Sequence, residues 1–444
     1  MDLAQRYTNV GVIGAAGKMG SGIALLLTHE MALRKTSPGA REERFKLTLM
    51  DVNDEALDGL KGYLRSQMRR LAEKSTVRLR AHYADRPDLV ENGEIIQAYV
   101  DDALDLARFT TDLDQLAGCR LVFEAIAENI DLKVKIYKQV KKLAPEAFIF
   151  TNTSSIPIRL LDEQAGLGGG LVGFHFYNPP AVQRLLELIT SPTTRDDLVA
   201  DAQQIAKDLK KKVIPASDIA GFIGNGHFIR DGLYGIAEME KLRGDYGFAG
   251  GTYMVNRVCQ DWLIRPMGIF QLIDYVGVDV FQCILGVMNQ FIEGEELHSD
   301  LIDELMKRGV RGGQNPDGSQ KDGFFRYEKG QISAVYDLDK GDYQPIAAAW
   351  SDRFDKALGG LPDGHFPWRA LSRDTSKTAK LEGYFGNLAK AEGLGARLGR
   401  DYLKRSKEIG EQLVSSGVAA KAEDVNGVLL NGFFHLYGPI NDYA

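Results

Sequence analysis

Short apolar runs alternate with longer segments of helical periodicity throughout the first 216 residues. Helical stretches such as 129–143 and 195–211 separate these runs. Buried parallel strands joined by crossover helices give this pattern. The sequence therefore predicts an α/β domain with a doubly wound, Rossmann-type sheet that ends near residue 216. The expected strands are 9–14, 46–51, 107–111, 120–125, 147–152, 171–178, 185–190 and 212–216.

Two segments lengthen this domain beyond its sheet. Residues 33–45 are polar and contain Ser37, Pro38 and Gly39, which predicts a surface insertion. Residues 54–104 are mostly helical in pattern and polar, and they are longer than an ordinary crossover. We expect them to form a projecting helical arm.

The rest of the chain is predicted to be mainly α-helical, because strand patterns fade after residue 218 and helical patterns such as 224–241 and 256–263 follow. A weak repeat divides it: Gly268 follows Asn256 by twelve residues, and Gly438 follows Asn426 at the same interval. This repeat suggests a duplicated helical unit with a boundary in the loop-rich region 311–345. We therefore expect three domains, at 1–216, 217–335 and 336–444.

The charge and cysteine content exclude several classes of protein. The chain has 54 basic and 61 acidic residues, a net charge of −7, which argues against nucleic acid or an anionic membrane as a partner. Cys119, Cys259 and Cys283 have no C-x-x-C spacing, so we expect neither a disulfide framework nor a metal site. No signal-peptide pattern begins the chain, and no apolar run approaches the ~20 residues of a membrane span. We expect a cytoplasmic location.

A glycine-rich turn joins the first strand to the first helix. Its spacing is G-x-x-G-x-x-G, one residue longer than the common dinucleotide fingerprint. The first glycine permits the tight turn, the second lets backbone amides approach a pyrophosphate, and the third lets the helix pack on the strand. The alternative is a tight structural connection without a ligand. The expected cofactor-binding residues of this turn are Gly14, Ala16, Gly17, Lys18, Met19 and Gly20.

Asp51 ends the second expected strand. A carboxylate there accepts hydrogen bonds from the adenosine ribose and repels a 2′-phosphate, which favours NAD over NADP. It lies further from the glycines than the usual ~20 residues, and the 33–45 insertion accounts for the difference. Capping of the following helix is a second role, compatible with the first.

A histidine and a carboxylate indicate the type of reaction. His175 lies near the end of an expected strand, and Glu187 lies twelve residues later on the next strand with apolar neighbours. A carboxylate holds a histidine in one tautomer and makes it a better base, as needed to take a proton from an alcohol that loses hydride. The alternative is a histidine that belongs to the hydrophobic core.

These motifs together resemble the L-3-hydroxyacyl-CoA dehydrogenases. Matching segments occur in that family's order and spacing: the glycine turn, 123–129 with Lys133, 151–155, 173–179 with Glu187, and 218–225. Segments 265–274 and 321–327 resemble its helical domain, and 415–442 resembles a second copy of that domain. The resemblance implies an NAD-binding domain at 1–216 followed by a helical dehydrogenase domain and a divergent duplicate.

The resemblance also assigns roles on the substrate side. It makes His175 the general base for the 3-hydroxyl group and Glu187 the group that orients it. Ser154 and Asn225 are expected to hydrogen-bond the reacting oxygen or the thioester carbonyl. Asn178 is expected to position the histidine loop and to contact both substrate and cofactor.

On the cofactor side, the resemblance places Glu128, Lys133 and Asn152 near the nicotinamide and its ribose. One departure from the family is Gly226, where arginine is common. A tandem helical domain can occupy the surface through which the family dimerises, so the chain is expected to be either a monomer or a homodimer.

A basic patch on the arm suits the phosphates of coenzyme A, since guanidinium groups bind phosphate through two hydrogen bonds. Residues 61–80 contain seven basic side chains and one acidic side chain. Arg65 and Arg69, one turn apart, are the expected contacts, and a solvated helix face is the alternative.

The resemblance thus implies NAD-dependent, reversible oxidation of a (3S)-3-hydroxyacyl-CoA to the 3-oxoacyl-CoA in a β-oxidation-like route. Two other functions remain open. One is a dehydrogenase of a free hydroxy acid or sugar acid on the same fold. The other is a non-catalytic NAD-binding protein, since a fold does not fix a function.

Overall fold

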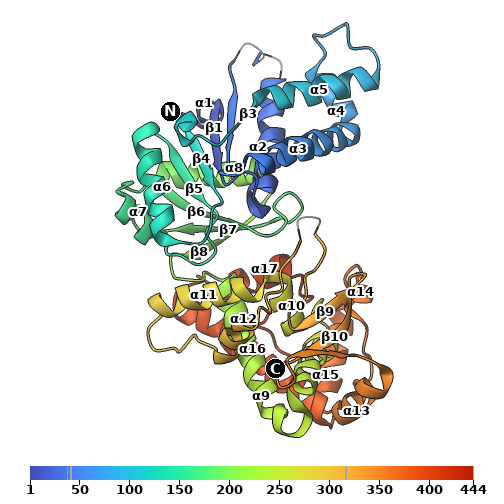
Figure 1. The fold of residues 1–444 in the computed structure, drawn as a ribbon. Coiled ribbons are helices and arrows are strands. Elements are labelled where there is room, and N and C mark those ends of the chain that lie inside the picture. The colour runs from blue at the N-terminus through green and yellow to red at the C-terminus, as the bar shows by residue number, and fades with distance from the viewer. Residues whose placement is uncertain (38, 41–42, 316–317, 444) are drawn as a thin grey trace. The chain divides into compact units, whose positions relative to one another are not determined.

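The computed structural model describes residues 1–37, 39–40, 43–315 and 318–443. The chain divides into two compact units, Met1–Asp218 and Ile219–Ala444 (Figure 1). Each unit has its own hydrophobic core. The first unit is the α/β part of the molecule, and the second is mainly helical.

All eight expected strands of the first unit form one sheet, in the order β3-β2-β1-β4-β5-β6-β7-β8. The strands are β1 (Asn9–Ile13), β2 (Lys46–Met50), β3 (Ala107–Thr110), β4 (Leu121–Glu124), β5 (Phe148–Thr151), β6 (Leu171–Phe176), β7 (Leu185–Thr190) and β8 (Lys212–Ser217). Strands β1 to β6 are parallel, whereas β7 is antiparallel to β6. The short segment 177–184 explains this reversal, because a parallel connection needs a dozen or more residues. The sheet is therefore mixed, and the Rossmann-type prediction is confirmed.

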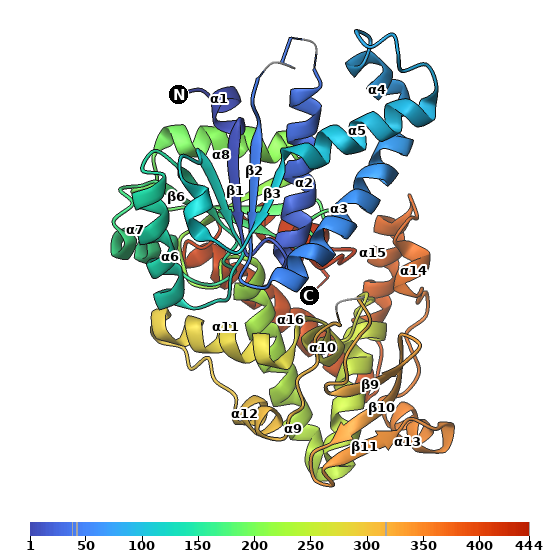
Figure 2. The same ribbon diagram turned by 45° about the horizontal axis from the view of Figure 1, so that its top comes forward.

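Helices cover both faces of this sheet, with α6 and α7 on one face and α8 on the other (Figures 1 and 2). Strands in such a sheet are buried on both sides, which is why all six residues of β6 are buried. The helices outside the arm are α1 (Leu3–Tyr7), α2 (Lys18–Lys35), the 3₁₀ turn η1 (Leu113–Leu116), α6 (Ile130–Leu143), α7 (Ile158–Ala165) and α8 (Asp196–Asp208).

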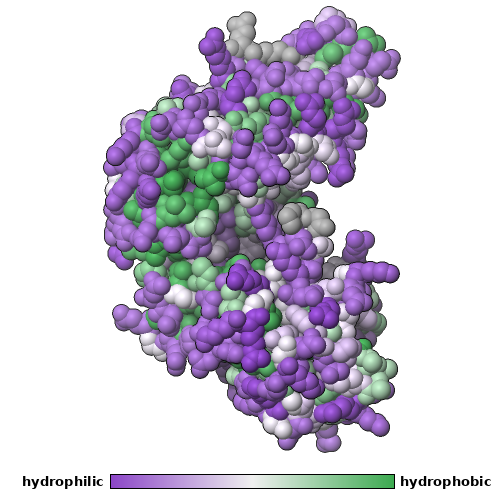
Figure 3. Space-filling model, viewed as in Figure 1, coloured by the Kyte–Doolittle hydropathy of each residue, from purple (hydrophilic) through white to green (hydrophobic). Residues whose placement is uncertain are grey.

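The expected arm consists of α3 (Asp54–Lys74), α4 (Thr76–His82) and α5 (Asn92–Leu106), between β2 and β3. One stripe of α3 is buried, formed by Leu57, Leu60, Leu64, Met68 and Ala72. Hydrophilic side chains cover much of the arm in Figure 3. The expected insertion at 33–45 begins within α2, which continues to Lys35, and its residues 38, 41 and 42 lie outside the described part of the chain.

The second unit is built around the long helix α9 (Gly224–Arg257), which is broken at Gly247, where φ is +72°. The other helical elements are the π turn η2 (Val258–Trp262), α10 (Ile269–Val276), α11 (Val278–Phe291), α12 (Asp300–Lys307), α13 (Ala348–Leu358), α14 (Trp368–Leu371), α15 (Lys377–Leu388), α16 (Leu394–Ser415) and α17 (Ala422–Gly432). Among the described residues no single helix is long and apolar enough to cross a membrane, although α10 and α11, bent by 91°, reach that length and composition as a pair.

The region 311–345, expected to be loop-rich, contains a small antiparallel sheet of order β11-β10-β9. Its strands are β9 (Phe325–Glu328), β10 (Gln331–Asp337) and β11 (Asp342–Pro345). The two outer strands are only four residues long and largely exposed. Strands this short and polar show little alternation of apolar and polar residues, so their sequence pattern resembles that of a loop. Strand β10 also runs across residue 335, the expected end of the first helical domain.

The repeated Asn and Gly residues make similar local contacts in both places, although the amide that donates to the asparagine lies 15 residues after Asn256 and 14 after Asn426. The Asn256 side-chain carbonyl accepts a hydrogen bond from the Gln271 amide, and that of Asn426 accepts one from the Ile440 amide, each at 3.0 Å. A Cβ atom at Gly268 would lie 2.3 Å from Asn256, and one at Gly438 would lie 2.1 Å from Asn426. Each glycine is therefore required by close contact with its asparagine.

Candidate active site

The glycine turn is fixed tightly between β1 and α2. The amides of Gly14 and Ala15 donate to the Met50 carbonyl of β2 at 2.9 and 3.0 Å. Gly14 has φ of +75°, a conformation that favours glycine. A Cβ atom at Gly20 would lie 1.9 Å from the Gly14 carbonyl oxygen, so no side chain fits there. The turn and the helix thus contact each other directly.

Helix α2 presents its N-terminus at this turn and suits an anionic group. Its N-cap residue is Gly17, and no side chain caps the helix. The amides of a first helical turn lack intrahelical partners, and together with the helix dipole they bind phosphate. Because the turn glycines leave room for close approach, the residues present fit the pyrophosphate of a dinucleotide.

Asp51 contacts the turn itself. Its Oδ2 accepts a hydrogen bond from the Ala16 amide at 3.0 Å, and its Oδ1 accepts one from the Asn53 amide at 3.2 Å. Asn53, and not Asp51, caps α3 by accepting from the Ala56 amide. The carboxylate therefore ties the lengthened turn to the end of β2. Its two oxygens offer about four lone pairs, which leaves capacity for ribose hydroxyls.

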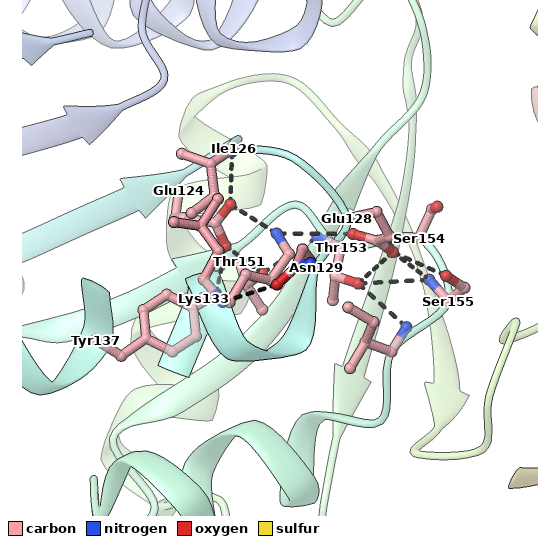
Figure 4. A network of polar contacts seen from close by, with 12 residues as sticks. Glu124, Ile126, Glu128, Asn129, Lys133, Tyr137, Thr151, Thr153, Ser154 and Ser155 are labelled. Atoms are coloured by element: carbon pink, nitrogen blue, oxygen red, sulfur yellow. Dashed lines mark hydrogen bonds and ion pairs between the residues drawn. The ribbon is translucent and has the colours of Figure 1, made fainter. Parts of the chain in front are cut away.

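A buried ionic network lies at the carboxyl ends of β4 and β5 (Figure 4). Glu124 and Lys133 are both fully buried and pair at 2.7 Å between Oε1 and Nζ. The second carboxylate oxygen of Glu124 accepts from Thr151 Oγ1 at 2.8 Å and from the Tyr137 hydroxyl. Glu124 was not among the expected site residues, because only its contacts, and not its position in sequence, distinguish it.

Glu128 lies next to this network and holds the loop after β5. Its Oε1 accepts from the hydroxyls of Thr153 and Ser155 and from the amides of Ser154 and Ser155, at 2.6 to 3.1 Å (Figure 4). Its Oε2 lies 3.6 Å from Lys133 Nζ. Burial opposes ionisation, but Lys133 and these donors hold the pKa of Glu128 below its ordinary value. The structure thus brings together Glu128, Lys133 and Ser154.

Asn152 links the ends of two neighbouring strands. It follows β5, and its side-chain carbonyl accepts a hydrogen bond from the Phe176 amide at the end of β6, at 2.9 Å. This bond fixes the backbone directly after His175. Asn178 follows in the same loop, and its peptide bond to Pro179 is cis.

His175 and Glu187 face each other across the antiparallel pair β6 and β7. The distance from His175 Nδ1 to Glu187 Oε2 is 3.8 Å, and Glu187 is fully buried. The other oxygen of Glu187 accepts from the Tyr177 hydroxyl at 2.6 Å. Burial and then the negative charge of Glu187 raise the pKa of Tyr177 well above its ordinary value, so this hydroxyl keeps its proton. The sequence predicted the histidine and its carboxylate but missed Tyr177.

The remaining expected residues lie elsewhere. Asn225 is the second residue of α9, in the second unit. Next to it, a Cβ atom at Gly226 would lie 2.9 Å from Leu413 of α16, which accounts for a glycine at this position. Arg65 and Arg69 are exposed on α3, and Arg69 donates to Gln97 of α5.

The first unit is thus a dinucleotide-binding α/β domain in which polar side chains gather at the carboxyl ends of the strands, as in dehydrogenases of this fold. Residues 9–219 match the NAD binding domain of 3-hydroxyacyl-CoA dehydrogenase, and residues 251–322 match the C-terminal domain of the same family. The chain belongs to the 3-hydroxyacyl-CoA dehydrogenase family and is an NAD-dependent oxidoreductase. The predicted family, cofactor and enzyme class are confirmed, as is the fold class of an α/β domain followed by a helical region, whereas the duplication of that region stays a prediction.

Individual relatives agree with this assignment. A 3-hydroxybutyryl-CoA dehydrogenase of Mycobacterium tuberculosis is 33% identical over 241 residues, which are 54% of this chain and 81% of that protein. A probable 3-hydroxybutyryl-CoA dehydrogenase of Deinococcus radiodurans is 29% identical over 326 residues, 71% of this chain and 99% of that protein. The crystal structure of 3-hydroxybutyryl-CoA dehydrogenase from Escherichia coli covers 98% of this chain and 90% of its own, with 19% identity and a TM-score of 0.63. The fold likeness therefore includes the C-terminal helices.

Proposed function

We propose that this protein oxidises a (3S)-3-hydroxyacyl-CoA to the 3-oxoacyl-CoA reversibly, with His175 as the general base. The main evidence for this proposal is the cross-strand pair of His175 and Glu187. The Glu187 carboxylate also accepts a hydrogen bond from the Tyr177 hydroxyl. The names of the relatives support a coenzyme A ester of a short 3-hydroxy acid as substrate. Multifunctional relatives of plants are named for fatty acid beta-oxidation, which supports a route of that kind.

The roles of the two residues follow from their chemistry. His175 takes the proton of the 3-hydroxyl group while carbon 3 loses a hydride. The bound NAD supplies the hydride acceptor. The imidazolium that forms is stabilised by Glu187, whose charge is buried and lies on the Nδ1 side of the ring. Tyr177 keeps the carboxylate in the orientation that faces the histidine.

The cofactor is held by the turn, by the strand ends and by the network of Glu128. The turn contributes Gly14, Ala16, Gly17, Lys18, Met19 and Gly20, and Asp51 binds the adenosine ribose. Glu128, Lys133, Asn152 and Asn178 line the nicotinamide end.

On the substrate side, Ser154, Asn178 and Asn225 hydrogen-bond the reacting oxygen or the thioester carbonyl. The exposed guanidinium groups of Arg65 and Arg69 bind the phosphates of coenzyme A.

A test of substrate and mechanism starts from NADH oxidation by the purified protein. The panel is acetoacetyl-CoA, a longer 3-oxoacyl-CoA and free acetoacetate. Turnover with the coenzyme A esters alone is expected. Turnover with free acetoacetate would favour a dehydrogenase of free acids, and NADH binding without any turnover would favour a non-catalytic protein.

Two variants test the base. His175→Ala is expected to abolish turnover and leave NADH affinity unchanged. Glu187→Gln is expected to lower kcat by about 10²–10⁴-fold with NADH affinity unchanged. Wild-type kcat in both variants would contradict the role of the pair.

We also propose that the second unit contains two helical domains, 217–335 and 336–444, the latter a divergent copy of the former. The similar contacts of Asn256 with Gly268 and of Asn426 with Gly438 support this duplication. The sheet β9–β11 then lies at their junction, because β10 crosses residue 335. A duplicated helical unit is compatible with a monomer as well as a homodimer, and sedimentation of the full chain distinguishes the two.

A further inference from the structure

A cavity of about 600 Å³ lies on the second unit, lined by residues of α14, the start of α15, the end of α17 and the segment after α17. It belongs neither to the glycine turn nor to the strand ends of the first unit. Its size is within the usual range of small-molecule sites, roughly 300–1,000 Å³. Its lining combines aromatic and aliphatic side chains with cationic ones.

The apolar wall consists of Trp368, Leu430 and Phe434. The Trp368 indole N–H donates to the Phe434 carbonyl at 2.8 Å, which joins α14 to the segment after α17. Phe434 has φ of +56°, unusual for a residue other than glycine, and its side chain is 53% exposed. Backbone strain of this kind is common at ligand sites. The hydrogen bond from the Trp368 indole to the Phe434 backbone thus holds the exposed Phe434 ring at the cavity.

The cationic side consists of Arg369, Arg373 and Lys377, spaced four residues apart. Within the described part of the chain, none of these three side chains forms a hydrogen bond or an ion pair, and no acidic residue lines the cavity. The nearby Asp374 does not neutralise them, because it pairs with Lys380 at 2.6 Å and accepts from Ser376.

Several other arginines of this unit are paired with carboxylates. Arg230 pairs with Glu295, Arg257 with Asp261, and Arg265 with Asp231. At this cavity, three cations lie beside two aromatic rings and no carboxylate is in the lining, in a chain with a net charge of −7. Guanidinium groups bind phosphate through two parallel hydrogen bonds, and aromatic rings stack on nucleobases.

We propose that this cavity binds an adenosine diphosphate group, with the base on Trp368 and Phe434 and the phosphates on Arg369, Arg373 and Lys377. Free ADP, coenzyme A and NAD all contain this group. This cavity shares no residue with the proposed active site, and it holds its ligand whether or not the chain acts on 3-hydroxyacyl-CoA.

Titration calorimetry of the full chain with ADP tests the site. ADP also fits the dinucleotide site of the first unit, so wild-type protein is expected to bind two equivalents. The variant Arg369→Glu/Arg373→Glu is expected to bind one, since loss of two charge-assisted contacts weakens the second site by at least about 100-fold. The matched control Arg397→Glu/Lys404→Glu makes the same change in charge on α16 and is expected to keep both equivalents.

The aromatic wall is tested with Phe434→Asn, because asparagine tolerates a positive φ. Loss of stacking is expected to weaken the second site roughly tenfold. Hydrogen exchange locates the site: ADP is expected to protect residues 368–377 and 430–436. Parallel titrations with coenzyme A and NAD show which of these sources occupies the site.

Three results would overturn the proposal. The first is a single ADP equivalent in wild-type protein. The second is equal affinity at this site for ADP and for inorganic pyrophosphate, which would indicate a phosphate site without base recognition. The third is a double variant that still binds two ADP equivalents but no longer binds vesicles of anionic phospholipid to which the wild-type protein binds. That result would indicate a membrane-surface patch.

Discussion

Tyr177, like Glu124, is a residue that the sequence did not identify, although it follows His175 by only two positions. Its hydroxyl donates to Glu187 at 2.6 Å, and its ring centroid lies 4.9 Å from that of the histidine. In the sequence it is one aromatic residue among many. His175 and Glu187 were predictable because a titratable residue in an apolar strand is unusual, whereas a tyrosine there is common.

Tyr177→Phe tests this contact. Removal of the hydroxyl leaves one oxygen of a buried carboxylate without its donor, and the carboxylate loses its fixed orientation toward His175. We expect kcat to fall by about tenfold, as for the loss of one hydrogen bond to a charged group, with the NADH dissociation constant unchanged. Steady-state kinetics and NADH fluorescence measure the two quantities, and an unchanged kcat would remove Tyr177 from the mechanism.

Glu128 makes a prediction about pH. Its folded pKa is lowered by Lys133 and by the donors of 153–155, against the effect of burial. Its stabilising contribution is therefore complete above the ordinary value of 4.5 and is lost as pH falls through the folded pKa. Glu128→Gln is expected to cost about 1–3 kcal/mol at pH 7. Urea unfolding of both proteins should show this difference shrinking below pH 4.5, and a constant difference would contradict it.

At the scale of elements, the sequence predicted every strand of the first sheet, because strands buried on both faces are continuous apolar runs. It did not predict that β7 is antiparallel, because the apolar pattern of a strand is the same for either direction. Only the shortness of the connection 177–184 indicates the reversal. It missed β9–β11, whose outer strands are short and exposed. Pairing with β10, whose last four residues are buried, and not local pattern, fixes such strands.

The contact between the glycine turn and α2 gives a prediction for this pair of elements. Gly20→Ala puts a methyl group 1.9 Å from the Gly14 carbonyl, so the turn or the helix must move. We expect NADH affinity to fall by about tenfold or more, in line with overpacking costs of about 1–3 kcal/mol. Fluorescence titration with NADH measures it.

Gly59→Ala is the matched control for this substitution. Gly59 lies inside α3, and a Cβ atom there would meet nothing within 4 Å. Alanine is expected to stabilise the helix by about 0.5–1 kcal/mol and to leave NADH affinity unchanged. A Gly20→Ala protein with wild-type affinity would show that the turn tolerates a side chain.

At the scale of the whole molecule, the distribution of charged residues matters more than the net charge. The net charge is −7, yet seven basic residues between positions 61 and 80 are all exposed on α3 and α4: Lys61, Arg65, Arg69, Arg70, Lys74, Arg78 and Arg80. The buried stripe of α3 explains this arrangement, because the helix turns its apolar side inward and its polar side to solvent. A local positive surface therefore exists on a negative protein, and an anionic substrate should respond to it.

Charge reversal at Arg65 and Arg69 tests whether this surface binds the phosphates of coenzyme A. Arg65→Glu/Arg69→Glu is expected to raise the KM for acetoacetyl-CoA by at least about tenfold, since two phosphate contacts are lost, and to leave the KM for NADH unchanged. The wild-type KM for the ester should also rise between 0.01 and 0.1 M salt, because the Debye length falls from about 30 to about 10 Å. The variant should lose this dependence. The control Arg397→Glu/Lys404→Glu changes the net charge by the same amount but leaves the arm unchanged. If this control raises the KM for acetoacetyl-CoA as much, the net charge of the molecule, and not the arm, attracts the substrate.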